Sequence, residues 1–469
     1  MRGSVATVRL NPSPNPRHLL LGWAAARDAG AALEPFMLGG DSAFYGERQD
    51  SYLLMGAWPD EHLQLPAEDM AAFPWQPGAQ RALGAIQTFI GDGGDRPADS
   101  LEEESCWRRP LTVGWLGHEL TSTQLSRHSS FLVLHPATGQ ADMVAVCRDG
   151  SDGAAARLAR ERAAQVRLAE AAGAAMKVLP PVSCTVVAPV GRRSHGRRIQ
   201  QVLAAIRAGD VYQVNLAHPL QLHGFPSGCV GRVAAFLDLW RDNPVPCPAF
   251  VQHGETSVLS LSPERYLARR RDLLESRPIK GTSPRGETAA ADQAMARALA
   301  ASAKDRAENI MIVDLVRNDL GKVAAIGSVA VPELRVIEEY ATVFQMVSTV
   351  TATLRADRDA LDLVRACFPG GSMTGAPKIE AMKIIDALEP TKRGVYSGAI
   401  GYFDYAGTMD LSIVIRTLVC RDGRCTIGSG GAVVADSDPA AEYQETLDKA
   451  AALIRAVGIV QREAEGDPA

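Results

Sequence analysis

The pattern of hydrophobic and polar positions changes character partway along the chain. Up to about Arg148 it is typical of short β-strands separated by Gly and Pro turns. The run Ala154–Ala175 is rich in Ala, Arg and Glu with apolar residues at helical spacing, so it predicts a helix, and Pro180-Pro181 ends this first part. The strands predicted in this first part are Ala43–Tyr45, Tyr52–Met55, Leu111–Leu116, Phe131–Leu134 and Met143–Cys147.

From Ser194 onward the predicted elements are longer. The predicted helices are His195–Ala208, Val233–Arg241, Ala290–Ala300, Ala303–Leu320, Leu361–Cys367, Ala376–Leu388 and Pro439–Ala456. The predicted strands are Tyr212–Leu222, those within Phe250–Leu261, Leu273–Ser276, one after a turn within Val336–Ala356, and a meander of Tyr396–Tyr405, Leu411–Cys420 and Cys425–Ile427. Gly209 is a natural helix C-cap, and Asp422-Gly423 is a strong hairpin signal.

Strands and helices do not alternate regularly, which argues against repeated βαβ units. We therefore predict an α+β fold, with large packed antiparallel sheets surrounded by helices. The predicted organisation is an N-terminal strand-rich subdomain with a linking helix over residues 1–185, a main domain over residues 186–460, and a polar C-terminal tail over residues 461–469.

Composition narrows the function classes. The 469 residues are 46% hydrophobic and 22% charged, as in ordinary globular proteins, and the net charge of −5 argues against a nucleic-acid-binding surface. The N-terminus lacks an apolar signal core, and no apolar run is long enough to span a bilayer. We therefore expect a cytoplasmic protein that binds neither membrane nor nucleic acid.

Cysteine and histidine usage limits the available chemistry. The eight cysteines are scattered without a CxxC pair, so a thiolate zinc site or redox couple is disfavoured. Cys420 and Cys425 flank the predicted hairpin turn and could face each other, with reduced thiols favoured in this compartment. All nine histidines lie at or before His253, so chemistry in the C-terminal half must use carboxylates, lysine, arginine or a metal.

The stretch Arg277–Thr282, with the sequence RPIKGT, is the centre of the functional hypothesis. Pro278 and Gly281 predict a sharp turn with open backbone N–H groups around Lys280. A desolvated lysine there would have a lowered pKa and could act as a nucleophile. The alternative is a solvated lysine on a tight turn.

Other residues suit a metal ion and an anionic ligand. Glu308 and Glu445 lie on separate predicted helices, where they are either Mg²⁺ ligands or solvated carboxylates. Pro369–Gly375 leads into a predicted helix start and could bind an anion, as could Gly428–Ala432. Arg416 lies in an apolar predicted strand and has either a buried ionic role or an exposed place on an edge strand.

These stretches together resemble one known family, the chorismate-utilising enzymes. The motifs that carry the resemblance are Arg277–Thr282 (RPIKGT), Asp314–Gly321 (DLVRNDLG), Gly371–Lys378 (GSMTGAPK), Tyr396–Tyr402 (YSGAIGY), Ile413–Thr417 (IVIRT) and Glu442–Ala450. The match extends from Gly191 to Gly458, which makes residues 186–460 the expected chorismate-binding catalytic domain. The resemblance implies packed antiparallel sheets surrounded by helices, and Mg²⁺-dependent replacement of the ring hydroxyl of chorismate.

The resemblance also implies roles for individual residues. Glu308 and Glu445 would bind Mg²⁺, which bridges to the ring carboxylate, and Glu264 would be the general acid that helps the hydroxyl leave. The residues expected to contact the ring carboxylate are Gly281 and Thr282, with Ser372 nearby. The residues expected to hold the enolpyruvyl carboxylate are Tyr396, Arg416, Gly430, Gly431 and Ala432.

Two positions sort the members of the family. Lys280 stands where anthranilate synthases have alanine, and lysine there marks the members that form aminodeoxychorismate, adding to the ring before ammonia displaces it. Gln213 stands where isochorismate-forming members have a lysine that activates water, which favours ammonia as the nucleophile. The resemblance therefore implies aminodeoxychorismate formation, with para-aminobenzoate and folate synthesis as the expected pathway and a specialised-metabolite pathway left open. The alternatives are the anthranilate-forming reaction and a catalytically silent ligand-binding homologue.

Two departures from the family pattern and two further expectations remain. Gln345 replaces a frequent histidine, which puts pyruvate elimination in doubt, and Ala432 replaces a third glycine without blocking its backbone N–H. The chain has no convincing glutaminase triad, so ammonia is expected from a separate glutamine amidotransferase subunit. Relatives bind tryptophan in a region that matches Asp41-Ser42 and Asn243–Pro246, and the sequence leaves open whether that pocket is filled here.

Overall fold

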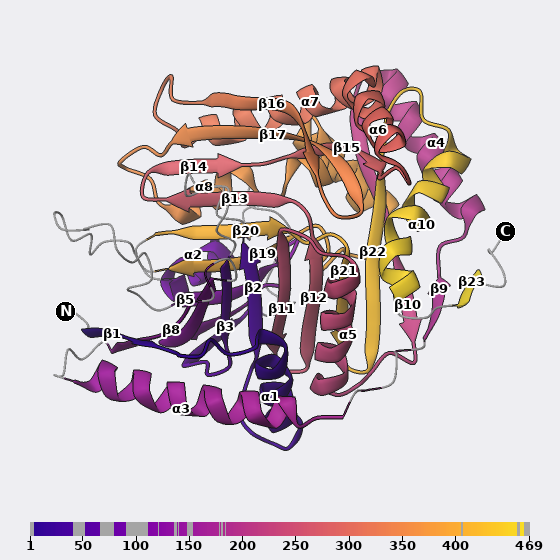
Figure 1. Cartoon of the computed structure of the whole chain (residues 1–469). Helices are drawn as coiled ribbons and strands as arrows, with labels where there is room; N and C mark the ends of the chain where they lie inside the picture. Colours follow the sequence, from indigo (N-terminus) through magenta and orange to yellow (C-terminus); the bar gives the residue numbers. More distant parts are fainter. Residues whose placement is uncertain are drawn as a thin grey trace.

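Two β-sheets form the frame of the molecule (Figure 1). The computed structural model describes residues 4–40, 52–65, 79–90, 111–147 and 153–463, apart from residues 121, 136, 137, 139, 178, 180, 181, 183, 405, 406 and 457–459. Within this part of the chain, the larger sheet has 13 strands and the smaller sheet has 10.

All the paired strands are antiparallel in the described ranges except β23, which runs parallel to β9. In spatial order, the larger sheet contains β1 (Ser4–Arg9), β8 (Gln140–Cys147), β7 (Ser130–His135), β3 (Tyr52–Gly56), β2 (Phe36–Gly40), β11 (Cys247–His253), β12 (Thr256–Ser262), β21 (Thr417–Arg421), β22 (Arg424–Val433), β10 (Gln213–His223), β9 (Thr185–Ala188) and β23 (Val460–Glu463), with β18 (Gly375–Ala376) beside β10. The smaller sheet contains β15 (Ile279–Pro284), β17 (Val343–Thr353), β14 (Leu273–Ser276), β13 (Arg265–Arg270), β20 (Met409–Ile413), β19 (Ala399–Asp404), β5 (Leu111–Leu116), β6 (Gln124–His128) and β4 (Glu61–Gln64), with β16 (Ala330–Glu339) beside β17.

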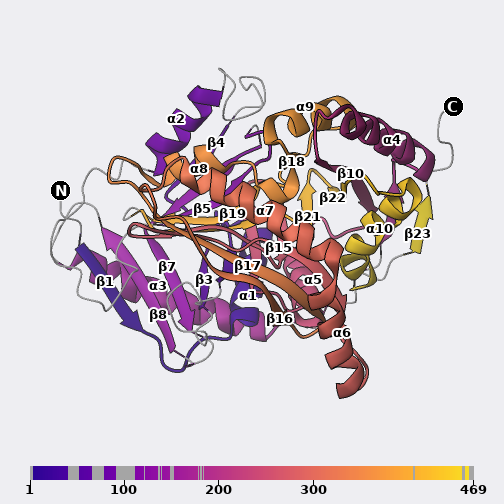
Figure 2. The same ribbon diagram turned by 90° about the horizontal axis from the view of Figure 1, so that it is seen from above.

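Helices cover the outer faces of both sheets. They are α1 (Pro16–Asp28), α2 (Ala79–Ile90), α3 (Ala154–Ala174), α4 (Arg192–Ala208), α5 (Cys229–Asp242), α6 (Ala289–Ala301), α7 (Ala303–Gly321), α8 (Ala360–Cys367), α9 (Lys378–Leu388) and α10 (Pro439–Ala456). Helices α1, α3, α5 and α10 pack on the larger sheet, and α6 and α7 pack near β15 and β17 (Figures 1 and 2). The order of layers is therefore helix, sheet, sheet, helix.

Alternating side chains along the strands build this layered core. On β5, Val113 and Trp115 point between the two sheets, whereas Leu116 belongs to the core under the helices of the smaller sheet. On β11, Val251 points between the sheets and Phe250 points toward the helices on the larger sheet. This period of two explains why both faces of the central strands are apolar, as packing between two layers requires. The predicted α+β fold is confirmed.

The N-terminal and C-terminal parts of the chain share both sheets. Strand β2 pairs with β11 in the larger sheet, and β5 pairs with β19 in the smaller sheet. The strands before residue 186 therefore do not form a sheet of their own in the described structure. The domain boundary predicted between residues 185 and 186 stays a prediction. Residues 461–463, predicted to begin a polar tail, belong to β23.

Most predicted elements are present with ends shifted by a few residues. Gly209 caps α4 with a φ of 85°, and the Asp422-Gly423 hairpin joins β21 to β22. Cys420 and Cys425 lie opposite each other across that hairpin as free cysteines. The predicted strand Ala43–Tyr45 lies outside the described residues.

Three predictions about local structure were wrong. Arg277–Thr282 was predicted as a tight turn, but Ile279–Pro284 is strand β15, and a bulge opposite β17 accommodates Gly281 at a φ of 94°. The predicted strand Leu411–Cys420 is two strands in different sheets, because the chain crosses from β20 to β21 at Val414–Arg416. In the region Val336–Ala356 the predicted turn is present at residues 340–342, but it joins two paired strands, β16 and β17, where one strand was predicted.

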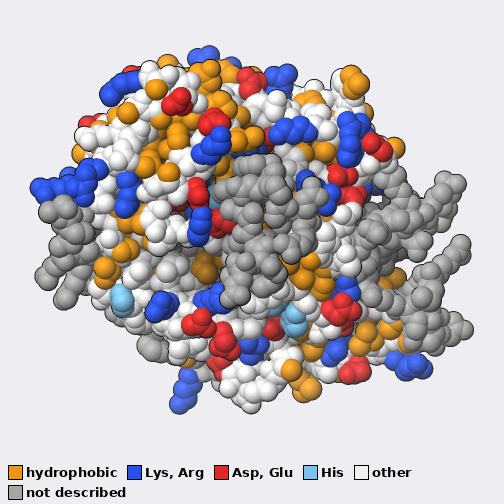
Figure 3. Space-filling model, turned by 180° about the vertical axis from the view of Figure 1, so that it is seen from behind, with side chains coloured by type: hydrophobic (Ala, Val, Ile, Leu, Met, Phe, Trp, Pro, Cys, Tyr) orange, Lys and Arg blue, Asp and Glu red, His pale blue; other side chains and the backbone are white. Residues whose placement is uncertain are grey.

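The surface shows mixed charge. Figure 3, which views the molecule from behind, shows Lys and Arg side chains interspersed with Asp and Glu side chains in the described part of that face. Among the described helices, none combines the length and the apolar character that crossing a bilayer requires.

Candidate active site

Most of the predicted functional residues meet around one cavity. The cavity has a volume of about 420 Å³ and lies where β15, β22, α7 and α10 come together with η3 (Gly371–Met373) and the segment before β21. The predicted residues that line it are Glu264, Lys280, Gly281, Thr282, Glu308, Ser372, Tyr396, Arg416, Gly430, Ala432 and Glu445. These residues are far apart in the sequence, so only the folded sheets bring them together.

Glu264 is a buried carboxyl group between β12 and β13. Its side chain is 7% exposed, and the Ser372 hydroxyl donates a hydrogen bond of 2.9 Å to Oε1. Burial raises the pKa of Glu264 to about 7, against the opposing effects of Ser372 and of the Lys280 charge. A carboxyl group with this pKa is partly protonated near neutral pH, so it can donate a proton to a leaving group.

Lys280 extends from the bulge of β15 into the same cavity. Its Nζ lies 3.8 Å from Oε2 of Glu308. Burial lowers the pKa of Lys280, the negative charge of Glu308 opposes that shift, and the positive charge of Lys449 adds to it. A Cβ atom at Gly281 would lie 3.0 Å from Asp305 and Leu299, and its φ of 94° is strained for other residues. Glycine therefore lets β15 pass close to α6 and α7 while it directs Lys280 inward.

Glu308 and Glu445 face the cavity from helices α7 and α10. Lys304 lies 3.9 Å from Glu308, and Lys449 makes a 2.6 Å ion pair with Glu445. Burial raises the pKa of Glu445, but Lys449 and other lysine charges overcome this effect and lower it overall. Two carboxylates from different helices thus line the same cavity, each paired with a lysine side chain.

Glu442 is a third carboxylate near this wall, and it was not predicted from the sequence. Its side chain is 6% exposed, and Oε1 accepts a hydrogen bond of 2.6 Å from Ser437. Its Oε2 is buried without a hydrogen-bond partner in the described structure, and it lies 3.1 Å from the Cβ position of Gly431. The spacing of Glu442 and Glu445, three positions apart on one helix face, is the signal that could have identified it.

Arg416 supplies a cation on another wall of the cavity. It lies at the crossing between the sheets with a φ of 49°, rather than within a continuous strand as predicted. Burial lowers its pKa, and no carboxylate lies within ion-pair distance of it in the described ranges. A partly buried guanidinium without a protein counter-ion is a suitable receptor for a ligand carboxylate.

Tyr396 and the glycines of β22 complete this wall. A Cβ atom at Gly428 would lie 2.1 Å from the Tyr396 ring, so the ring can lie against β22 only because this residue is glycine. A Cβ atom at Gly430 would approach the neighbouring Ala217 to 2.8 Å. Close strand approach, as well as ligand binding, therefore requires glycine in this stretch.

Some of the predicted residues lie away from the cavity lining. Gln213 and Gly431 are not among the lining residues; Gln213 is fully buried with no partner for its side-chain amide in the described structure. Of the predicted anion-binding loop before α9, Ser372 and Met373 line the cavity. The first residue of α9, Lys378, does not line the cavity. Its side chain instead bonds to Asp319 and, at 2.7 Å, to the carbonyl of Cys367.

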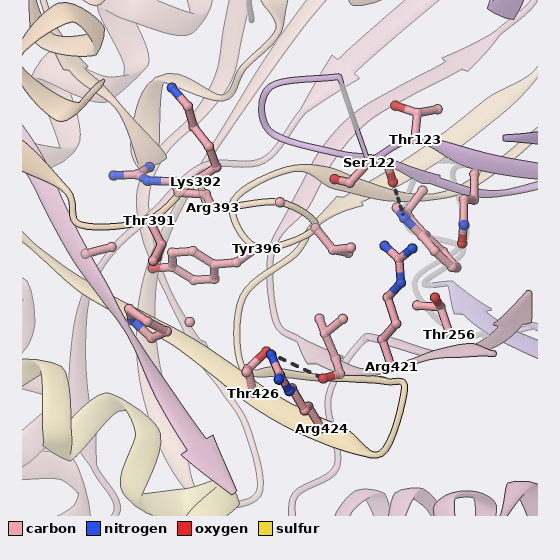
Figure 4. A pocket seen from close by; sticks show the side chains of 18 of the residues that line it. Ser122, Thr123, Thr256, Thr391, Lys392, Arg393, Tyr396, Arg421, Arg424 and Thr426 are labelled. Atoms are coloured by element: carbon pink, nitrogen blue, oxygen red, sulfur yellow. Dashed lines mark hydrogen bonds between the residues drawn. The ribbon is translucent and has the colours of Figure 1, made fainter. Parts of the chain in front are cut away.

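A second and larger cavity lies on the other side of Tyr396. Its volume is about 970 Å³, and Tyr396 and Gly428 line both cavities. Figure 4 shows Arg421, Arg424, Lys392 and Tyr396 around it. The predicted catalytic and metal-binding carboxylates and Lys280 line the smaller cavity only, so chemistry rather than size identifies the candidate site.

The family model for chorismate binding enzymes matches residues 101–455. This match spans most of the chain and contains every residue that lines the smaller cavity. The chain belongs to the chorismate binding enzyme family.

Curated relatives agree with this membership. The chain is 51% identical over 263 residues to aminodeoxychorismate synthase component 1 of Klebsiella aerogenes, covering 56% of this chain and 57% of that protein. It is 48% identical over 329 residues to aminodeoxychorismate synthase of Streptomyces griseus, covering 69% and 45%. The matches thus span about half the length of these curated relatives.

Solved structures share this fold. Anthranilate synthase component I from Streptococcus pneumoniae superposes with a TM-score of 0.72 at 24% identity, covering 86% of this chain and 92% of that chain. The menaquinone-specific isochorismate synthase from Escherichia coli has the same TM-score at 18% identity, covering 97% and 95%. At these identities the likeness establishes the shared fold alone.

Proposed function

We propose that this protein converts chorismate and ammonia to 4-amino-4-deoxychorismate and water. The observation that carries the proposal is Lys280, whose pKa is lowered by burial, in one cavity with Glu264, whose pKa is raised. The names of the curated relatives, aminodeoxychorismate synthases, support the choice among the reactions of the family.

In this proposal each of the cavity residues has a separate role in the reaction. The uncharged form of Lys280 attacks the ring while Glu264 donates a proton to the departing ring hydroxyl, which leaves as water. Ammonia then attacks the ring, and the amine of Lys280 leaves as its bond to the ring breaks. Arg416 and Tyr396 hold the enolpyruvyl carboxylate, and the backbone of Gly281 and Thr282 holds the ring carboxylate, which fixes the reacting carbon near Lys280.

The cavity also fits a Mg²⁺ ion. Mg²⁺ is commonly bound by one or two carboxylates together with ligand oxygens and water, and Glu308 and Glu445 both line the cavity. The unpartnered Oε2 of Glu442 adds a third acceptor nearby. When bound, the ion would supply positive charge that fixes the ring carboxylate and stabilises charge developing on the ring.

We further propose that nitrogen comes from a partner subunit in a cytoplasmic pathway to para-aminobenzoate and folate. The words component 1 in the names of relatives support a second component, and we propose that this component hydrolyses glutamine. The purified chain should use ammonium directly and use glutamine only after an amidotransferase subunit is added. Turnover of glutamine by the chain alone would contradict the proposed need for a separate amidotransferase subunit.

The test of the proposal is incubation of the chain with chorismate, Mg²⁺ and ammonium, with identification of the product by mass. Aminodeoxychorismate is the expected product, whereas anthranilate would show the alternative reaction. Lys280→Ala should fold and bind chorismate but lose about 10²-fold or more of the rate, because the nucleophile is gone. Without ammonium, the intact mass of the wild type should show a chorismate-derived adduct on Lys280.

Lys383→Ala is the matched control, because Lys383 is an exposed lysine on α9 that pairs with Glu380 outside the cavity. It should retain the wild-type rate. Aminodeoxychorismate formation by Lys280→Ala at that same rate would reject the role of Lys280, and with it the choice of this reaction over anthranilate formation.

A further inference from the structure

Two histidines and a glutamate form a cluster outside the chorismate cavity. Glu34 lies just before β2, His62 lies on β4, and His253 is the last residue of β11. One nitrogen from each histidine and one carboxylate oxygen all lie within 4.8 Å of one another. Three separate chain segments, belonging to both sheets, therefore meet at this point.

Two distances within the cluster match the spacing of ligands around a metal ion. His62 Nδ1 lies 3.2 Å from His253 Nε2 and 3.3 Å from Glu34 Oε2. In a tetrahedral zinc site with bonds of about 2.0–2.1 Å, neighbouring ligand atoms are about 3.3–3.4 Å apart. A single ion near His62 can therefore reach all three atoms with small side-chain adjustments.

A backbone hydrogen bond orients the Glu34 carboxylate within the cluster. Oε1 of Glu34 accepts a 2.7 Å hydrogen bond from the backbone N–H of Gly254, while Oε2 is buried without a hydrogen-bond partner in the described structure. The buried His253 ring stands edge-on to the His62 ring, with 4.7 Å between the ring centroids. A hydrogen bond such as that from Gly254 holds a metal-ligating side chain in one orientation.

A hydrogen-bonded histidine pair explains the cluster less completely. A neutral His62 carries at most one proton on Nδ1. It can therefore donate a hydrogen bond to His253 Nε2 or to Glu34 Oε2, but not to both. The other acceptor would then stay unsatisfied in a largely buried place, which costs free energy. A divalent cation satisfies all three lone pairs at once.

We propose that Glu34, His62 and His253 bind a divalent transition-metal ion, with Zn²⁺ as the ion that best suits two imidazoles and one carboxylate. Imidazole ligands favour Zn²⁺ over Mg²⁺ and Ca²⁺, which take oxygen ligands. The His62 side chain is 41% exposed, so a water molecule can complete the tetrahedron from the solvent side. The bound ion would join the segment before β2, strand β4 and the β11–β12 hairpin.

The test is titration of the chelator-treated full chain with Zn²⁺ by calorimetry, followed by metal analysis after dialysis. One equivalent of Zn²⁺ should bind to this site, and Co²⁺ in its place should give the visible absorption of a tetrahedral ion. His62→Ala removes an exposed ligand, and Glu34→Gln keeps the oxygen that accepts from Gly254. Both variants should fold and bind Zn²⁺ at least about tenfold more weakly.

Two controls separate this site from other places that could hold a metal. His135→Ala removes a histidine outside the cluster, at the end of β7, and should leave the affinity for Zn²⁺ unchanged. The double change Glu308→Gln and Glu445→Gln alters the chorismate cavity and should also keep this equivalent of Zn²⁺.

Thermal unfolding provides a readout that does not depend on activity. Zn²⁺ should raise the Tm of the wild type and not that of His62→Ala, because a ligand that binds only the folded state stabilises it. Basal activity of His62→Ala with Mg²⁺ should equal that of the wild type. A chain that binds no Zn²⁺, or that binds it equally well as His62→Ala and Glu34→Gln, would show that the cluster is only a hydrogen-bonded histidine pair.

Discussion

At the scale of single residues, burial sets the pH at which Glu264 can act. Its pKa of about 7 means that the acid form is present below that pH and is lost as the pH rises through it. We therefore expect kcat/KM to fall on the alkaline side with an apparent pKa near 7. Glu264→Gln should remove this alkaline limb and lower the rate by about 10²–10⁴-fold, as for other general acids. An unchanged pH profile in Glu264→Gln would assign proton donation to another group.

The two carboxylates on α7 and α10 are predicted to act as one metal site. Glu308→Gln or Glu445→Gln should raise the Mg²⁺ concentration needed for half-maximal activity and lower the rate. The double change should cost much less than the sum of the two single changes, because either one already disrupts the site. Activity measured against Mg²⁺ concentration tests this. Additive losses with the Mg²⁺ requirement unchanged would mean that these are ordinary helix carboxylates.

At the scale of elements, one arginine fixes the segment between α9 and β19. Arg393 and Glu389 form an ion pair whose side chains are only 2% and 6% exposed. Arg393 also donates hydrogen bonds of 2.7 Å to the carbonyls of Met373 and Asn215. Because Met373, Asn215 and nearby Tyr396 line the smaller cavity, this network fixes the relative positions of several lining segments.

Arg393→Met should therefore destabilise the protein by about 3–5 kcal/mol, because it leaves Glu389 buried and unpaired. The adjacent Lys392 pairs with Asp386 on the surface, with side chains 62% and 47% exposed. Lys392→Met is the matched control and should cost only about 0–1 kcal/mol. Urea unfolding of both variants measures the difference in the free energy of unfolding; similar losses would show that the Arg393 network adds no stability.

At the scale of the whole molecule, the two parts of the chain depend on each other. A fragment of residues 186–469 would lack β2, which pairs with β11, and β5, which pairs with β19. It would also expose the core between the sheets, which contains Trp115 and Phe131 from the N-terminal part. We expect this fragment to aggregate or to lack cooperative unfolding, as measured by size-exclusion chromatography and circular dichroism. A monomeric fragment with cooperative unfolding would establish residues 186–460 as an independent domain.

The local pattern of the chain predicted most elements, because helical and strand periodicities and their end signals act over a few residues. Gly209 at the end of α4 and Asp422-Gly423 in the β21–β22 hairpin are examples. The same pattern failed at Val414–Arg416, because two apolar strands in different sheets look like one strand when they follow each other directly. It failed at Arg277–Thr282 because the bulge depends on pairing with β17, which is distant in sequence.

The sequence by itself determined the fold class, the family resemblance and the set of chemical groups available to the site. The tertiary structure decided where those groups stand and in what state. It buried Glu264 and Lys280 and so moved their pKa values in opposite directions, it brought Glu442 beside the predicted carboxylates, and it left Gln213 outside the cavity lining. The reason is physical: residue types and local spacing are written along the chain, whereas burial, charge neighbours and ligand spacing arise only when distant strands and helices pack together.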